Sequence, residues 1–205
     1  MQTLILNRRT ALLGAVSVLG GCSTLNALNA ATEPLNTYDL LPVMGSKKGG
    51  RTSRTLLIAR PQASAALATD RIMIRPDSAS IAYLPDARWS DELPLVFQSL
   101  LIRSISATDR IAYVGRSDAG PVPDKALLVR MDAFEVNALA DDTFEVHVDI
   151  ELTIINDRDQ RVVATRSFSQ SQSTPSEDAR AVVSAFQDVL NNLIPTLSEW
   201  VIQRV

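Results

Sequence analysis

Hydrophobic and polar residues alternate strictly along residues 144–154. The apolar positions are Phe144, Val146, Val148, Ile150, Leu152 and Ile154, and Glu145, His147, Asp149, Glu151 and Thr153 lie between them. A period of two is typical of a β-strand with one buried face. We therefore expect a strand here, a turn at 156–159, and a hairpin partner over 161–170.

Shorter apolar segments, bounded by Pro, Gly, Asp or Ser, predict further strands upstream of this hairpin. We expect them at 38–42, 55–59, 71–75, 80–84, 111–114 and 126–136. In the last of these the alternation changes phase near Ala133-Phe134, which indicates a β-bulge.

Two other stretches repeat apolar residues at helical spacing. In the first they are Leu93, Val96, Phe97, Leu100, Leu101 and Ile105. Ser90 is its expected N-cap, Pro94 falls in the first turn, and the helix should end near 108–109. The second follows Thr174-Pro175-Ser176-Glu177, which has the form of a capping box, and Pro195 should kink it. These elements predict one α+β domain over 37–205: an antiparallel or mixed sheet with two main helices packed on one face.

The chain begins with features of an export signal. Arg8 and Arg9 precede a short apolar run, which is well under the ~20 residues that a membrane-spanning helix needs. The run leads into Leu19-Gly20-Gly21-Cys22, which looks like a bacterial lipobox. We expect residues 1–21 to be a signal peptide, cleaved between Gly21 and Cys22. Cys22 would carry a covalent diacylglycerol and an N-linked acyl chain such as palmitate.

Two alternatives to lipidation are a first core helix with a buried thiol, and an uncleaved anchor. The Arg8-Arg9 pair also resembles a twin-arginine signal, but Ala11 stands where a bulky residue is usual, so the export route stays open. Residues 22–36 are small and polar, which predicts a flexible tether. Ser23 after the lipidated position favours the outer membrane of a Gram-negative bacterium, with the domain facing the periplasm.

Net charge and cysteine content narrow the kinds of binding and metal sites that the chain can form. The formal charge of −3 includes Arg8 and Arg9, so the chain after the signal carries −5, which gives no general attraction to nucleic acid. Cys22 is the only cysteine, so a disulfide or a cysteine-based metal site is excluded. The basic loop 46–51 contains glycines that are suited to phosphate contact, but it lacks the spacing of a phosphate-binding loop and is best interpreted as a solvated loop.

No catalytic set is recognisable. His147 is the only histidine. With Glu145, Asp149 and Glu151 it shares one face of the predicted strand, where side chains two residues apart stand ~6–7 Å from each other. A solvated face is therefore the default interpretation, and a metal site would need ligands from elsewhere. We expect no metal and no cofactor beyond the lipid on Cys22.

The ordered pattern resembles a known family, the ABC-type transport auxiliary lipoproteins (PqiC/YmbA-like). The resemblance covers most of the chain after the signal. It rests on the lipobox Cys22, Tyr38-Asp39-Leu40, Ile81-Ala82-Tyr83 followed by Arg88-Trp89, the 127–155 region, and Glu199-Trp200-Val201. It implies an α+β domain, no enzymatic activity, and three partners: an MCE-domain protein, an ABC permease and an ATPase. Such systems are thought to move phospholipid or other hydrophobic molecules between two membranes.

Several interpretations remain open at this level. The leading one is a non-catalytic adaptor, with Trp89 and Arg88 as candidate partner contacts because an aromatic beside a charge is typical of a binding hot spot. Trp89 packing over the start of the first helix is the alternative, and Trp200 is expected in the core. A periplasmic lipid carrier and a stand-alone envelope-assembly lipoprotein are the competing functions.

Overall fold

The structure is a computed structural model that describes residues 35–118, 120–140 and 143–205. The signal segment, with Gly21 and Cys22, lies outside the described residues, so its processing and lipidation stay predictions. Residues 36–205 form one compact unit. Its elements are β1 (Asn36–Tyr38), β2 (Thr52–Ile58), β3 (Gln62–Ala63), β4 (Arg71–Arg75), β5 (Ala82–Trp89), α2 (Leu93–Ser106), β6 (Ile111–Arg116), β7 (Lys125–Ala138), β8 (Phe144–Asn156), β9 (Arg161–Thr174) and α3 (Ala179–Ile202).

Within the described residues, nine strands form one mixed sheet, and β7 is its central strand. On one side β7 pairs antiparallel with β8 along its whole length. On its other side it pairs in parallel with β2, then β3, then β4. Strand β9 extends the sheet beyond β8, β6 extends it beyond β2, and β5 and β1 extend it beyond β4. The predicted α+β class is confirmed, and the sheet is mixed rather than antiparallel.

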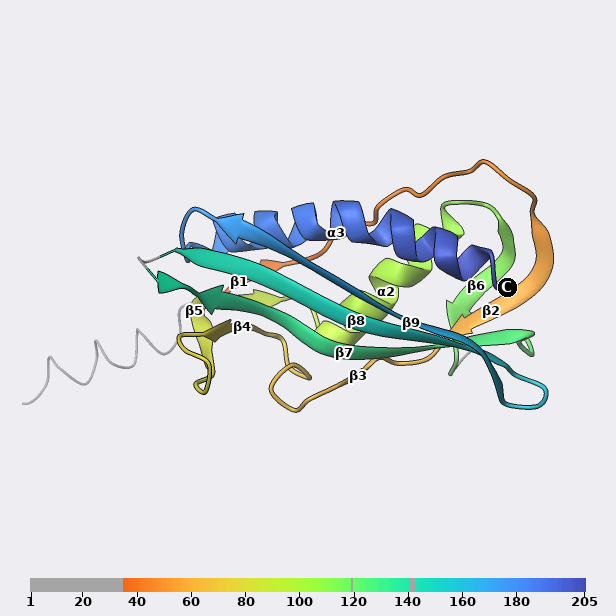
Figure 1. Cartoon of the computed structure of the whole chain (residues 1–205), viewed down its shortest axis with the longest axis horizontal. Coiled ribbons are helices and arrows are strands. Elements are labelled where there is room, and N and C mark those ends of the chain that lie inside the picture. Colours follow the sequence, from red (N-terminus) through yellow and green to blue (C-terminus); the bar gives the residue numbers. More distant parts are fainter. Residues whose placement is uncertain (1–34, 119, 141–142) are drawn as a thin grey trace, which may run out of the picture. The chain divides into compact units, whose positions relative to one another are not determined.

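The sheet has a helix-covered face and an open face (Figure 1). Helices α2 and α3 both lie on the first face, as predicted. The apolar positions of β8 point toward them, and the β8 side chains from Val146 to Ile154 on that parity are fully buried. The polar positions of β8 point to the opposite side, which we call the outer face. None of the helices in the described residues is long and apolar enough to cross a membrane.

Four aromatic side chains, one from each of four elements, fill the space between sheet and helices. Phe134 of β7 stacks on Phe186 of α3, with ring centroids 4.5 Å apart and planes 5° apart. Trp89 of β5 contacts both rings edge-on, at 6.0 and 5.5 Å. Phe97 of α2 contacts Phe134 at 6.3 Å. Because edge-on and offset-stacked contacts are the favoured aromatic geometries, this cluster fixes both helices on the sheet.

The predicted bulge in β7 is present and decides which residues face the core. The pairing with β8 shifts between Met131 and Ala133, so Asp132 has no partner residue in the ladder. One extra residue changes the side-chain parity of all that follows it. Met131 and Phe134, three residues apart, are therefore both buried among the helices.

Several predicted strand ends are wrong. Strand β1 ends at Tyr38 instead of running through Pro42, because Leu40 leaves the sheet and is buried in the core. Strand β5 runs on to Trp89, and β9 runs on to Thr174, which pairs with Phe144. In both cases pairing with a neighbouring strand extends the strand beyond the segment that its own sequence predicts.

Both predicted helix caps are also wrong. Helix α2 begins at Leu93 with Glu92 at the N-cap, and no side chain caps it. The Ser90 hydroxyl instead donates a hydrogen bond to Asp39 (3.2 Å). Helix α3 is capped by Asp178, whose carboxylate accepts from the backbone N–H groups of residues 180 and 181. Thr174 cannot cap α3 because it still belongs to β9. Helix α3 continues through Pro195.

Candidate functional site

The outer face of β8 carries the predicted row of titratable side chains, and two of them, His147 and Glu151, bond to neighbouring strands. The His147 imidazole Nδ1 lies 2.9 Å from the Ser171 hydroxyl on β9. Thr153 and Thr165 form a similar cross-strand pair at 3.0 Å. Within the described residues, no group of three or more His, Cys, Asp or Glu is placed to hold a metal ion. Instead of a metal site, this row of polar side chains presents hydrogen-bonding groups on the outer face.

Arg130 organises the centre of the outer face. Its guanidinium donates two hydrogen bonds to the Asp132 carboxylate, at 2.8 and 2.9 Å, and one to Glu151 of β8, at 2.6 Å. The hydrogen bond from Arg130 holds the pKa of Asp132 below its usual range. Regular alternation places Asp132 on the same face as Arg130, and the bulge leaves Asp132 without a partner residue on β8. The result is a fixed patch of mixed charge.

A hollow lies beside this patch, where the neighbouring strand is interrupted. Strand β2 ends at Ile58 and β3 begins at Gln62, and the break at Arg60-Pro61 leaves residues 128–129 of β7 without a strand partner on that side. The cavity has a volume of about 150 Å³ and is lined by Ala59, Arg60, Gln62, Leu128, Val129, Arg130, Glu151 and Thr153. A second hollow of about 300 Å³ shares Gln62 and Arg130 with it. We call the two together the outer-face groove.

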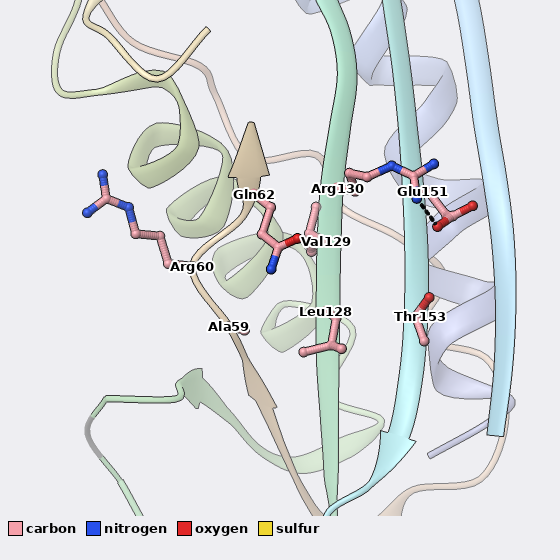
Figure 2. A pocket seen from close by; sticks show the side chains of 8 residues that line it. All are labelled: Ala59, Arg60, Gln62, Leu128, Val129, Arg130, Glu151 and Thr153. Atoms are coloured by element: carbon pink, nitrogen blue, oxygen red, sulfur yellow. Dashed lines mark hydrogen bonds and ion pairs between the residues drawn. The ribbon is translucent and has the colours of Figure 1, made fainter. Parts of the chain in front are cut away.

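Figure 2 shows how the groove is built. Leu128 and Thr153 lie on neighbouring strands, Arg130 reaches across to Glu151, and Arg60 extends away from the other side chains. Leu128 is a large apolar residue with 40% of its surface exposed. The first hollow is smaller than the roughly 300–1,000 Å³ of a small-molecule site. An apolar floor beside an ionic rim suits one side chain of a partner better than a whole ligand.

Strand β9 forms a long free edge next to this face. Within the described residues it pairs with β8 alone, over its full length. Most of its residues are serine, threonine or glutamine, and its only charges are Arg161 and Arg166. Arg166 covers the ring of Phe168, with the guanidinium carbon 4.8 Å from the ring centroid. An edge of this length without proline or acidic residues can accept an added strand.

A larger groove lies at the other end of the sheet, where β1, β5 and the start of α3 meet. Its volume is about 650 Å³, and its lining is Asn36, Tyr38, Ile74, Pro76, Ala82, Tyr83, Leu84, Pro85, Asp86, Glu177, Asp178, Ala179 and Arg180. Apolar and aromatic residues form much of the wall, and three carboxylates lie on it. We call it the end groove.

The two residues predicted as partner contacts separate in the structure. Trp89 is only 1% exposed and lies in the aromatic cluster, so its prediction as a surface anchor is wrong. The physical reason is that β5 extends to Trp89, and alternation along the strand turns the indole inward. Arg88 points outward, donates to the Thr37 hydroxyl (3.2 Å) and lies 3.8 Å from the Asp70 carboxylate. Its partner contact stays a prediction. Trp200 is in the core, as expected.

The outer-face groove was not predicted from the sequence, although Arg60-Pro61 is a signal that could have located it. Proline cannot donate to a strand ladder, so a break beside a long strand is expected there. The predicted solvated loop at 46–51 is exposed, as expected. One feature of it was missed: Gly49 covers the guanidinium of Arg110, which is buried.

Comparisons with known proteins give the chain a context. The model of a family described as the ABC-type transport auxiliary lipoprotein component matches residues 38–197. The uncharacterized protein bll6063 of Bradyrhizobium diazoefficiens is 28% identical over 191 residues, which are 92% of this chain and 50% of that protein. The chain thus spans about half the length of this relative.

Solved structures share the fold. The crystal structure of protein XCC0632 from Xanthomonas campestris, assigned to the family DUF330, aligns with a TM-score of 0.75 at 24% identity. The alignment covers 82% of this chain and 96% of that one. The crystal structure of an uncharacterized protein aligns with a TM-score of 0.62 at 15% identity, covering 83% and 98%. At these identities the likeness is one of fold.

Proposed function

The chain belongs to the family of ABC-type transport auxiliary lipoproteins, and from this premise we propose that it is a non-catalytic, lipid-anchored subunit of a transport system. The system would move phospholipid or other hydrophobic molecules across the periplasm. Its other subunits would be an MCE-domain protein, an ABC permease and an ATPase. The observation that carries the proposal is the family match over residues 38–197.

The described surface supports a docking role. The β9 edge offers unpaired backbone groups for strand addition, which gives affinity without requiring a particular sequence. The neighbouring outer-face groove offers one apolar position, Leu128, framed by the Arg130–Glu151 pair. An extended segment of a partner lying along β9 would place one part of the partner close to this groove. The cross-strand pairs of the outer face keep the surface rigid, which lowers the entropic cost of binding.

A lipid carrier is the second candidate, and the end groove is the observation that favours it. Its volume of about 650 Å³ falls within the range of ligand sites. However, Asp86, Glu177 and Asp178 lie on its wall, and they disfavour the phosphate of a phospholipid. The space between sheet and helices is already filled by the aromatic cluster. Lipid that co-purifies with the unanchored domain and is lost in a groove variant, Ala82→Trp, would favour the carrier.

The adaptor proposal is tested by purifying partners from cells. A C-terminally tagged chain is crosslinked in living cells, extracted in detergent, and its partners are identified by mass. We expect an MCE-domain protein with its permease and ATPase. Leu128→Asp should reduce their yield several-fold, whereas Leu139→Asp should not, since Leu139 is a similarly exposed leucine outside the groove. Recovery of unrelated envelope proteins alone would refute the proposal.

A further inference from the structure

The loop from Asp39 to Arg51 has a surface that the docking role does not use. It follows β1 and passes over the helices (Figure 1). Leu41 and Met44 are 64% and 66% exposed, whereas Leu40 between β1 and Leu41 is buried at 1%. The loop thus anchors itself with one apolar side chain and presents two others to the surroundings.

Hydrogen bonds to the helices beneath the loop hold its backbone, and with it the exposed positions of Leu41 and Met44. The Leu41 backbone N–H donates to the Gln187 side-chain oxygen (2.9 Å), and the Gln187 amide donates back to the Leu41 carbonyl (3.2 Å). The Val43 N–H donates to the Ser104 hydroxyl at 3.0 Å. At Gly45 a Cβ would meet the Thr108 methyl at 3.1 Å, so the backbone lies directly on the end of α2. A backbone held at these points presents Leu41 and Met44 with little loss of entropy on binding.

A second cluster of side chains follows in the same loop. Lys47, Lys48 and Arg51 are all exposed. Arg51 lies 3.7 Å from Asp109, but neither lysine has an ion-pair partner within the described residues. Gly49 lies between Lys48 and Arg51 with φ of 120°, and its backbone rests against the Arg110 guanidinium. Three exposed cations therefore follow two exposed apolar side chains along the same loop.

Two acidic groups, one in the loop and one beneath it, are paired with arginines. Asp39 lies 3.9 Å from Arg103, and the Glu199 carboxylate accepts a hydrogen bond from Arg110. Although the chain as a whole is acidic, this local surface keeps the positive charge of its lysines. Apolar side chains next to unpaired lysines are the combination that binds the interface of an anionic membrane, because the apolar groups enter the interface and the cations attract the headgroups.

We propose that the loop 39–51 is a membrane-contact surface that binds anionic phospholipid through Leu41, Met44, Lys47 and Lys48. The inference rests on the lipid anchor at Cys22 that the proposed function includes, but it is independent of the docking partner and of the outer-face groove. The tether predicted from the sequence would contribute the 13 residues from 23 to 35, and a flexible segment of that length has an r.m.s. reach of about 20 Å. A domain held that close to a bilayer needs only a weak contact to stay on it, because the effective concentration is high.

The test holds the domain at a vesicle without relying on acylation at Cys22. A chain starting at Ser23 with an N-terminal hexahistidine tag is bound to vesicles that contain nickel-chelating lipid, with or without phosphatidylglycerol. Met44→Cys then supplies the only thiol, which carries an environment-sensitive fluorophore. We expect a blue-shifted, brighter emission on phosphatidylglycerol vesicles that is reversed by high salt. The matched control is Val122→Cys, since Val122 is an 87% exposed apolar residue of another loop and should show no shift.

The charge contribution is measured in the same labelled chain. Each lysine near an anionic surface is worth a factor of about five in binding, so Lys47→Gln with Lys48→Gln should lower the ratio of inserted to solvent-exposed probe about 25-fold. Emission at position 44 that is unchanged by phosphatidylglycerol would overturn the proposal. So would an equal shift at position 122, because proximity to the vesicle alone would then explain the signal.

Discussion

Phe134 is the residue on which the packing of helices against sheet depends most directly, so Phe134→Ala is the perturbation that tests the fold. Its ring is 1% exposed and contacts Trp89, Phe97 and Phe186. Replacement of a buried Phe by Ala costs about 3–5 kcal/mol from lost transfer free energy and from the cavity. Three rigid rings line this cavity and cannot collapse into it, so we expect a loss of about 4–5 kcal/mol.

The assay is urea unfolding of residues 36–205 followed by circular dichroism. The free energy of unfolding of such a domain is about 5–15 kcal/mol, so the variant should be barely stable or unfolded. Val162→Ala is the control, because Val162 is 64% exposed, and it should cost less than about 1 kcal/mol. The coupling of the stacked pair is measured in a cycle of the milder variants Phe134→Leu and Phe186→Leu, and it should be about 0.5–1.5 kcal/mol. A loss below about 1.5 kcal/mol for Phe134→Ala would refute the packing argument.

Three further predictions concern single contacts, each measured as the free energy of unfolding. Gly49→Ala should destabilise the domain by about 1–3 kcal/mol, because φ is 120° and a Cβ would stand 2.8 Å from a guanidinium nitrogen; Gly50→Ala, with open space around it, should be near neutral. Arg75→Met leaves the nearly buried Glu135 carboxylate unpaired and should cost about 3 kcal/mol, much of it recovered by adding Glu135→Leu. Arg110 donates a hydrogen bond to Glu199 and so lowers the pKa of this carboxylate. The stability that the pair contributes is therefore fully present above pH ~4.3 and is lost as pH falls through the lowered pKa. The stability gap between wild type and Glu199→Gln should therefore shrink in acid, and a constant gap would contradict that assignment.

The sequence predicts those features of the fold that depend on local periodicity. The alternation in 144–154 predicts β8, and the phase change near Phe134 predicts the bulge, since both follow from which side chains must be buried. The apolar stripes likewise predict α2 and α3. These signals are strong because each repeats over many residues of one segment.

The features that depend on pairing between distant segments could not be read in this way. Trp89 stands among charged residues, and only the extension of β5 shows that its side chain turns into the core. Thr174 resembles a helix cap but remains in β9 because Phe144 pairs with it. The outer-face groove arises where β2 and β3 part along β7, a relation between segments some 70 residues apart in the sequence. The local propensity of a segment carries no information on such contacts between distant segments.

The most direct test of the docking account is photocrosslinking from a single position on the free edge. A photoreactive amino acid is placed at Ser169, an exposed residue of β9, and separately at Ser184, an exposed residue of α3. The account predicts that irradiation of cells joins the chain to a transport subunit from position 169 and not from position 184. An equal yield from both positions, or a transport subunit captured only from 184, would contradict it.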